Sequence, residues 1–111
     1  MILRGEMYDV DFGEPVGHEP VGRRPSLVVS ANLLNNGPGS LIGVVPITST
    51  RYGLRSHIEI DDMKTGLTRV SFARCDQLRM VSTKRLVMRR GLASLLTMLQ
   101  VDAALRFLLD V

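Results

Sequence analysis

The sequence predicts an α+β fold, in which a small β-barrel of six or seven short strands is followed by one C-terminal helix. Up to Gly91, short apolar or alternating runs are separated by glycine, proline and asparagine, which is typical of strands joined by turns. After Gly91 the chain contains no glycine or proline and is rich in leucine, alanine and methionine, which favours a helix. The regular strand–helix alternation of a parallel sheet is absent.

Each expected strand is a short run bounded by turn residues. The strands are expected at 6–12, 26–30, 41–50, 56–60, 69–75 and 78–82, with a further one at 86–90. Alternation in the run 56–60 places His57 and Glu59 on one face and the two isoleucines on the other. Pro46 indicates an edge strand or a bulge, because proline has no N–H to donate to a neighbouring strand. Between the strands, 13–25 reads as a loop and 32–40 as a turn-rich connector with one helical turn.

The C-terminal helix is expected over about 95–109, with Ser94 as its N-cap. Its apolar residues cover well over half of the helix circumference, which is more than contact with one sheet requires. Two explanations stay open from the residues alone. A second copy of the chain covers the outer side of the helix, or the single helix is deeply packed within its own domain.

Length and composition indicate one globular domain over residues 1–111. Hydrophobic residues make up 45% and charged residues 23%, and no apolar run is long enough to span a bilayer. The N-terminus lacks the apolar region of a secretory signal, and a single cysteine excludes an internal disulfide or a cysteine-based zinc site. We therefore expect a cytoplasmic protein with no membrane partner.

The basic residues are mostly arginine, with 12 arginines against 2 lysines and a formal net charge of +3. Arginine presents a planar fork of donors that fits phosphate, whereas lysine presents a point charge. A GC-rich genome, which favours arginine codons, explains the same bias without function. From the residues alone, the chain is a small arginine-rich barrel that is suited to binding nucleic acid.

Four segments carry a resemblance to a known family. They are "RGEMYDVDF" at 4–12, "GHEPVGRRPSLVVS" at 17–30, "VVPITST" at 44–50 and "ARCDQLRMVS" at 73–82. In this order and spacing they resemble the MazF/PemK toxins of bacterial toxin–antitoxin systems, and "GHE" with "RCDQ" resembles the PemK/Kid-like branch. The resemblance covers nearly the whole chain. It implies an SH3-like β-barrel with a C-terminal helix, assembled as a homodimer.

The resemblance also implies an activity, a substrate and a partner. Family members cleave single-stranded RNA at short sequences without a metal or cofactor, and so inhibit translation and growth. The ribose 2′-hydroxyl attacks the adjacent phosphorus, which leaves a 2′,3′-cyclic phosphate or 3′-phosphate and a 5′-hydroxyl; DNA lacks this nucleophile. The RNA is mRNA, with rRNA and tRNA as further possibilities. An acidic MazE/PemI-like antitoxin, whose extended C-terminal segment lies across the RNA groove, holds such toxins inactive.

The segment 73–82 supplies two of the candidate catalytic residues. Within an expected strand, Arg74 and Asp76 point the same way and Cys75 points to the opposite face. Asp76 then accepts the 2′-hydroxyl proton, and Arg74 stabilises charge on the phosphate, because a guanidinium is too weak an acid to donate a proton. The alternative is a purely structural Arg–Asp pair.

Three further catalytic candidates come from the other segments. Arg24 precedes Pro25, which restricts it to extended conformations, and it matches a functional arginine of the family. Thr48 matches the family's active-site threonine and can donate to a phosphate oxygen. His18 matches the PemK-like histidine, and an imidazole titrates near neutral pH, so His18 competes with Asp76 for the role of general base.

Other residues are expected to bind RNA rather than to catalyse its cleavage. They are Glu19, Arg23, Ser49, Thr50, Arg51, Tyr52, Gln77 and Arg79. Tyr52 is the best candidate for stacking on a base, and Gln77 can contact a base edge. His57 and Glu59 are only two possible ligands on one strand, so we predict no metal site.

Two alternative functions stay open. CcdB-like toxins share the barrel but poison DNA gyrase by binding through their C-terminal helix, without hydrolysis. A family member whose nuclease activity has decayed would be an RNA-binding barrel. The segments "RRP" and "RCDQ" argue against the first alternative.

Overall fold

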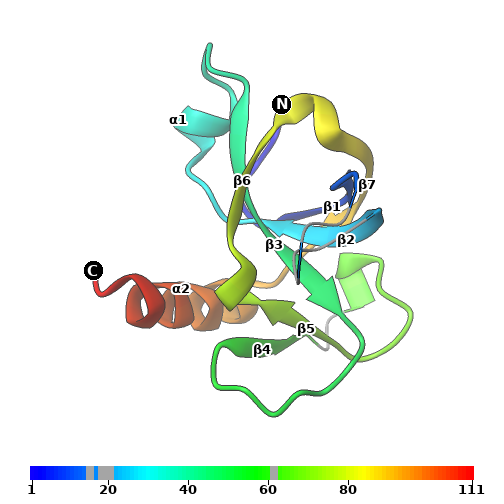
Figure 1. The fold of residues 1–111 in the computed structure, drawn as a ribbon, viewed down its shortest axis with the longest axis vertical. Helices are drawn as coiled ribbons and strands as arrows, with labels where there is room; N and C mark the ends of the chain where they lie inside the picture. Colours follow the sequence, from blue (N-terminus) through cyan, green and yellow to red (C-terminus); the bar gives the residue numbers. More distant parts are fainter. Residues whose placement is uncertain (15–16, 18–21, 61–62) are drawn as a thin grey trace.

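The computed structural model describes residues 1–14, 17, 22–60 and 63–111 (Figure 1). The strands are β1 (Glu6–Asp11), β2 (Arg23–Val28), β3 (Leu41–Thr48), β4 (His57–Ile60), β5 (Ser71–Arg74), β6 (Arg79–Ser82) and β7 (Leu86–Leu92). The helices are α1 (Asn32–Asn35) and α2 (Leu95–Leu109), with 3-10 turns η1 (Met63–Thr65), η2 (Cys75–Gln77) and η3 (Thr83–Arg85). The predicted α+β class and the C-terminal helix are confirmed.

The strands form one antiparallel, barrel-like sheet that does not close. Its order is β4-β5-β3-β2-β1-β7, and β6 pairs with β3 beside this path. The long strand β3 therefore lies at the centre: β2 pairs along one side of it, while β6 and β5 share the other side. Within the part of the chain that is described, no helix is long and apolar enough to cross a membrane.

Pro46 does not mark an edge strand, and that expectation is wrong. It lies in β3, opposite Ser26 of β2. On the other side, β6 pairs with Leu41–Val44 and β5 pairs with Ile47–Thr48. Pro46 thus lies where β3 changes partner, and a residue without an N–H is tolerated there because neither of these two strands pairs with it.

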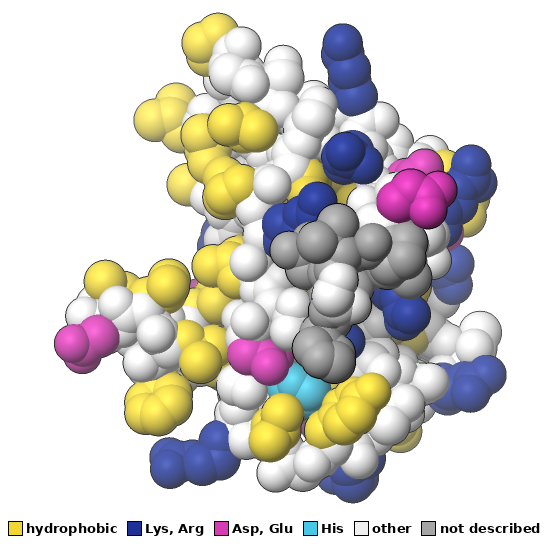
Figure 2. All heavy atoms as spheres, viewed as in Figure 1, with side chains coloured by type: hydrophobic (Ala, Val, Ile, Leu, Met, Phe, Trp, Pro, Cys, Tyr) yellow, Lys and Arg dark blue, Asp and Glu magenta, His cyan; other side chains and the backbone are white. Residues whose placement is uncertain are grey.

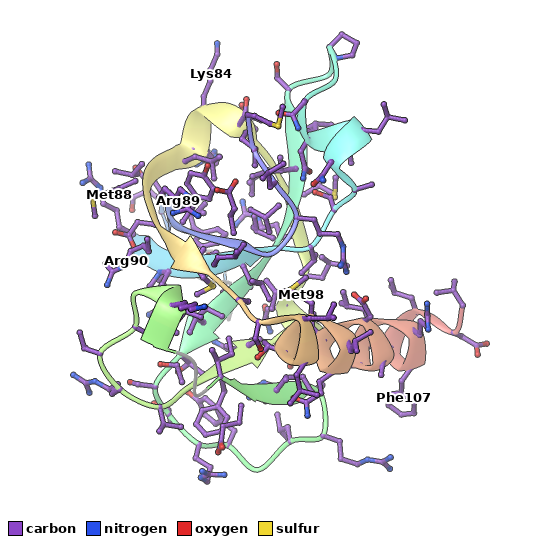
Figure 3. The ribbon with its side chains drawn as sticks, turned by 180° about the vertical axis from the view of Figure 1, so that it is seen from behind. Lys84, Met88, Arg89, Arg90, Met98 and Phe107 are labelled. Carbon is purple, nitrogen blue, oxygen red and sulfur yellow. The ribbon has the colours of Figure 1, made fainter. Side chains whose placement is uncertain are left out.

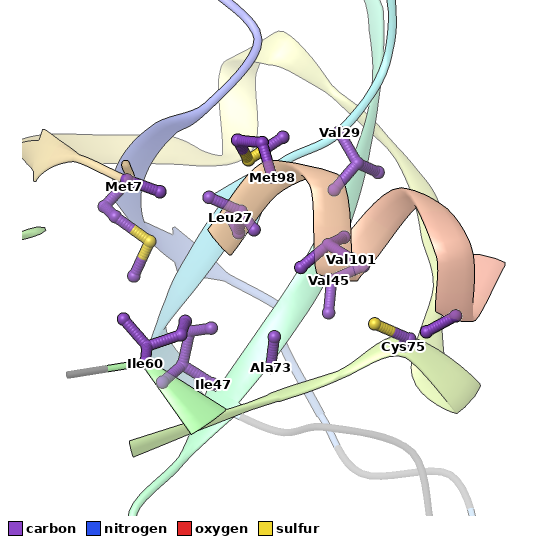
Figure 4. Packing of buried hydrophobic residues seen from close by; sticks show 12 residues of the cluster. Met7, Leu27, Val29, Val45, Ile47, Ile60, Ala73, Cys75, Met98 and Val101 are labelled. Atoms are coloured by element: carbon purple, nitrogen blue, oxygen red, sulfur yellow. The ribbon is translucent and has the colours of Figure 1, made fainter. Parts of the chain in front are cut away.

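The larger core lies between the sheet and α2 (Figure 4). It contains Met7, Leu27, Val29, Val45, Ile47, Ile60, Ala73, Cys75, Ala93, Met98, Val101 and Ala104. A smaller cluster fills the other face of the sheet at the far ends of β2 and β3, and contains Val10, Phe12, Val28, Ile42, Val44 and Val81. The two clusters use alternate residues of the same strands, as the pleat requires.

Helix α2 is packed on one side only. Thr97, Met98, Val101 and Ala104 are its buried residues. Leu95, Leu96, Leu99, Phe107 and Leu109 are exposed, and Figure 2 shows hydrophobic side chains gathered over this helix. The explanation of a deeply packed helix therefore does not hold, and the outer side of α2 is apolar and uncovered in the single chain.

The predicted cap of α2 is confirmed, and it sets a stability prediction. The Ser94 hydroxyl accepts from the backbone N–H of Thr97 at 3.1 Å. Ser94→Ala removes this acceptor from the first helical turn, so the free energy of unfolding should fall by about 1 kcal/mol. Urea denaturation followed by circular dichroism measures the change. An unchanged midpoint would mean that α2 begins without help from Ser94.

Candidate active site

The strand register brings the predicted site residues onto one face of the sheet. Residues directly opposite each other in neighbouring strands point to the same side. Thr48 of β3 is opposite Phe72 of β5, and Arg74 of β5 is opposite His57 of β4. Phe72 and Arg74 are two residues apart, so Thr48, Arg74 and His57 share a face. The same face carries Arg24, since the β2–β3 register, continued by two residues, places it opposite Thr48.

Arg24 and Thr48 line a pocket of about 360 Å³ at the end of β2 and β3. Ser49, Thr50, Arg69 and Arg90 are also among its lining residues, so the pocket is rich in hydroxyls and guanidinium groups. Such groups are the ones that bind phosphate. Figure 2 shows most Lys and Arg side chains in this view on the side of the molecule away from α2.

The Thr48 hydroxyl is oriented by its own backbone. It accepts from the N–H of Thr50 at 3.1 Å, within the turn that ends β3. A hydroxyl that accepts one hydrogen bond keeps its own proton for donation. Thr48 can therefore donate to an oxygen of a group bound in the pocket, as the sequence predicts.

The expected strand geometry of Arg74 and Asp76 is wrong. Strand β5 ends at Arg74, and Asp76 lies in the 3-10 turn η2. The Cys75 N–H continues the β4–β5 ladder by donating to the carbonyl of Ser56 at 3.1 Å, and the chain then turns, with the Cys75 carbonyl accepting from the Leu78 N–H at 3.2 Å. Cys75 points into the core as expected, but the 3-10 turn, and not strand alternation, places Asp76.

Asp76 is held by His57 rather than by Arg74. The two atoms His57 Nε2 and Asp76 Oδ1 are 3.0 Å apart. The His57 side chain is 3% exposed and that of Asp76 is 30% exposed. Since a carboxylate only accepts hydrogen bonds, Nε2 is the donor in this pair. The alternative of a structural Arg74–Asp76 ion pair has no support among the described ion pairs.

Arg74 is braced by an aromatic ring. Its Cζ lies 5.6 Å from the centroid of the Tyr52 ring, a distance typical of a cation–π contact. Its Nε is buried and has no hydrogen-bond partner within the described residues. The Tyr52 side chain, which is exposed, comes from the loop between β3 and β4. This loop therefore orients Arg74 from outside the sheet.

Cys75 lies between these two residues in the chain, and its thiol is buried in the core. Its side chain is 1% exposed. Burial, with a smaller contribution from the nearby Asp76 carboxylate, raises the pKa of the thiol to about 12. A thiol that stays protonated is a poor nucleophile and a poor metal ligand.

The remaining predicted residues lie at the ends of the strands, in η2 or in the loop that follows β3, apart from two that are not described. Arg23, Ser49 and Thr50 are exposed at the strand ends, and Gln77 is half-buried in η2. Arg51 pairs with Glu59 at 2.9 Å and stacks over Phe72, with Cζ 4.7 Å from the ring centroid. His18 and Glu19 lie outside the described residues.

Arg79 extends the basic face along β6. It pairs with Val44 of β3, which is an even number of residues from Thr48, so Arg79 lies on the same face as Thr48. Its Cζ is 5.5 Å from the Phe12 ring centroid. The described residues contain no group of three or more His, Cys, Asp or Glu side chains that could hold a metal ion.

Sequence reasoning missed three residues of this region. His57 was considered only as a metal ligand, although its alternation with isoleucines in 56–60 correctly placed it on the polar face. Arg69 and Arg90 line the pocket with Arg24, but they come from a loop and from β7. No local signal links residues so far apart, because the sheet register alone brings them together.

A comparison with protein families decides the identity. The model of the "PemK-like, MazF-like toxin of type II toxin-antitoxin system" family matches residues 3–109. The chain belongs to this family. The prediction of a MazF/PemK-type endoribonuclease toxin is thereby confirmed.

Related proteins agree in sequence and in fold. The toxin is 33% identical to the endoribonuclease MazF9 of Mycobacterium tuberculosis (strain ATCC 25618 / H37Rv), over 99% of this chain and 98% of that protein. The crystal structure of MazF from Deinococcus radiodurans superposes with a TM-score of 0.83 at 26% identity, covering 99% of this chain and 97% of that one. A MazE–MazF crystal structure from the same organism gives a TM-score of 0.78 at 26% identity, covering 98% and 96%.

Proposed function

We propose that this toxin is a metal-independent endoribonuclease that cuts single-stranded RNA by transesterification. The observation that carries the proposal is the shared sheet face of Arg24, Thr48 and Arg74, with Asp76 hydrogen-bonded to His57, the residue opposite Arg74 in the strand register. The endoribonuclease relative in Mycobacterium tuberculosis supports the reaction class. The family match over 3–109 supports a single toxin domain over 1–111.

The reaction begins at the ribose 2′-hydroxyl. Asp76 removes its proton, and the 2′-oxygen forms a bond to the adjacent phosphorus. The bond from phosphorus to the 5′-oxygen breaks, and this oxygen leaves with the electron pair and takes up a proton. The products are a 2′,3′-cyclic phosphate, which water opens to a 3′-phosphate, and a 5′-hydroxyl. Atoms and charge balance without a metal or cofactor.

The basic groups act where negative charge builds up. Arg74 and Arg24 stabilise the charge on the phosphorane oxygens, and the Thr48 hydroxyl donates to a non-bridging oxygen. In this proposal Asp76 is the general base, and His18, the other candidate for that role from the sequence, supplies the proton to the 5′-oxygen.

The residues around Arg24, Thr48 and Arg74 are proposed to recognise the RNA strand. The exposed Tyr52 ring offers a surface on which a base can stack. Arg51, which stacks over Phe72, and Arg79, which stacks over Phe12, are proposed to bind the RNA as well. Arg23, Ser49 and Thr50 contact the sugar–phosphate backbone, and Gln77 and Glu19 contact base edges. In this proposal, these contacts select the RNA sequence at which the strand is cut.

Partners and location follow from the same proposal. The apolar outer side of α2 supports a homodimer, in which a second copy covers exposed side chains such as Leu99 and Phe107. The solved MazE–MazF structure supports an acidic antitoxin as the inhibitor, since an acidic segment complements the basic face. We place the toxin in the cytoplasm, where its RNA substrates, mRNA foremost, are found.

The test is RNA cleavage in EDTA with end-group analysis of the products. Wild type should leave a cyclic phosphate or 3′-phosphate and a 5′-hydroxyl. Asp76→Asn should lower the rate by about 10²–10⁴-fold through loss of the base, and Arg24→Ala by about 10²–10³-fold through loss of charge stabilisation.

Lys84→Ala is the matched control, because it removes an exposed cation from η3 at the other end of the molecule (Figure 3). It should cleave at the wild-type rate. A folded wild type that cuts none of a mixed-sequence RNA panel would overturn the proposal in favour of an RNA-binding barrel or a gyrase-binding toxin.

A further inference from the structure

We propose that His57 is a positioning residue of the cleavage site, which holds Asp76 in the orientation that accepts the 2′-hydroxyl proton. The inference rests on the proposed function. It starts from the 3.0 Å hydrogen bond between His57 Nε2 and Asp76 Oδ1, in which one partner is buried and the other reaches solvent. Because only 3% of its side chain is exposed, we infer that the imidazole acts through Asp76 rather than by contacting RNA itself.

The hydrogen-bonding capacity of His57 and Asp76 determines which ring nitrogen of His57 carries the hydrogen. Asp76 Oδ1 only accepts, so Nε2 carries the hydrogen. Nδ1 is buried and has no hydrogen-bond partner within the described residues. A proton there would be a buried donor without an acceptor, which is costly, so the ring is assigned as the Nε2–H tautomer. His57 thus presents one donor to one carboxylate oxygen and leaves Asp76 Oδ2 for the substrate.

The surrounding residues fix the imidazole ring. Tyr52 meets it edge-on, with ring centroids 5.6 Å apart and planes at 90°. Arg74 stacks over the same tyrosine ring, and the strand register places Arg74 directly opposite His57. A single frame of His57, Tyr52 and Arg74 therefore orients both the proposed base and the proposed phosphate ligand.

The location of Asp76 in the fold explains why its side chain needs a hydrogen bond from His57 to orient it. It lies in the three-residue turn η2 and not in a strand, so the sheet alone does not orient its side chain. A valine or isoleucine at position 57 would suit a strand and leave no unpaired Nδ1. A buried polar ring at this position lowers the folding stability. Alignment of Asp76 is a function that explains why the ring is there.

The experiment compares His57→Phe with His57→Gln on one short RNA that wild type cuts, chosen from a mixed-sequence library. His57→Phe keeps an aromatic ring against Tyr52 but has no donor, so kcat should fall about 10- to 100-fold, with KM within about twofold of wild type. His57→Gln can donate to Asp76 Oδ1 from its amide and should recover most of that loss.

Ser94→Ala serves as the stability control, because it weakens the fold away from the site and should keep the wild-type kcat. A fully active His57→Phe would overturn this inference but not the proposed function, since Asp76 would then need no hydrogen-bond donor. Equal kcat losses in both variants, with no recovery in His57→Gln, would assign His57 to packing. A wild type that cuts no RNA would instead overturn the proposed function and this inference with it.

Discussion

Gly91→Ala is expected to lower the free energy of unfolding by about 3 kcal/mol or more, the largest stability effect we predict from one methyl group. A Cβ at Gly91 would lie 2.1 Å from the carbonyl oxygen of Lys64 and 2.6 Å from the carbonyl carbon of Thr65. Both are backbone atoms of η1, so no side chain can move aside. Thr65 is 0% exposed, which leaves η1 no room to shift without breaking the core.

The matched control is Gly39→Ala. No atom lies within 4 Å of a Cβ at Gly39, and its φ lies outside the left-handed region. Alanine should be neutral there or stabilise the fold by about 0.4–1 kcal/mol, because it restricts the unfolded chain. Urea denaturation of both variants gives the comparison. Equal midpoints would contradict the close packing of η1 against β7.

This packing also supports the pocket that contains Arg24. Arg90, next to Gly91 in β7, reaches Asp9 of β1 at 3.2 Å and the carbonyl of Gly66 at 3.2 Å. Figure 3 shows Arg90 on β7, beside the segment that forms η1. Because Arg90 lines the pocket, we expect a disturbed η1 to displace one of the pocket's arginines, and so to weaken the proposed RNA binding together with stability.

The sequence was sufficient where the determinants of structure are local. Ser94 and the uninterrupted run after it defined α2 from residue 95 to 109, as observed. Turn-rich segments separated the strands correctly, and only their ends differ by a few residues. These features depend on neighbours in the chain, which a sequence displays directly.

The sequence was insufficient where two distant segments meet. The sequence predicts that strand β5 runs to Cys75, whereas the strand ends at Arg74 and the turn η2 follows. The partner of Asp76 is not predictable from neighbouring residues, since His57 is 19 residues away in the chain. The residue types of the site were predictable from a family resemblance, whereas their contacts required the register of β3, β4 and β5.

Replacing Arg74 should have the largest effect on cleavage among the residues that contact Tyr52. Arg74→Ala should lower kcat by about 10²–10³-fold, because the proposed charge stabilisation of the phosphorane is lost. Arg74→Lys keeps the charge but should recover only part of this loss. An ammonium group lacks the planar fork and cannot stack on the Tyr52 ring as a guanidinium does. Single-turnover cleavage of one RNA separates this loss from product release.

Arg55→Lys tests whether the loss of any arginine–aromatic stacking contact slows cleavage, or only the loss of the contact between Arg74 and Tyr52. Arg55 makes the same kind of contact, with Cζ 5.7 Å from the Phe107 ring centroid, but against α2. It should cleave at the wild-type rate, since it preserves charge away from the shared face. A fully active Arg74→Lys would show that a point charge suffices, and the Tyr52 contact would then serve the fold. A fully active Arg74→Ala would remove Arg74 from the catalytic group, leaving Arg24 as the cation beside the phosphate.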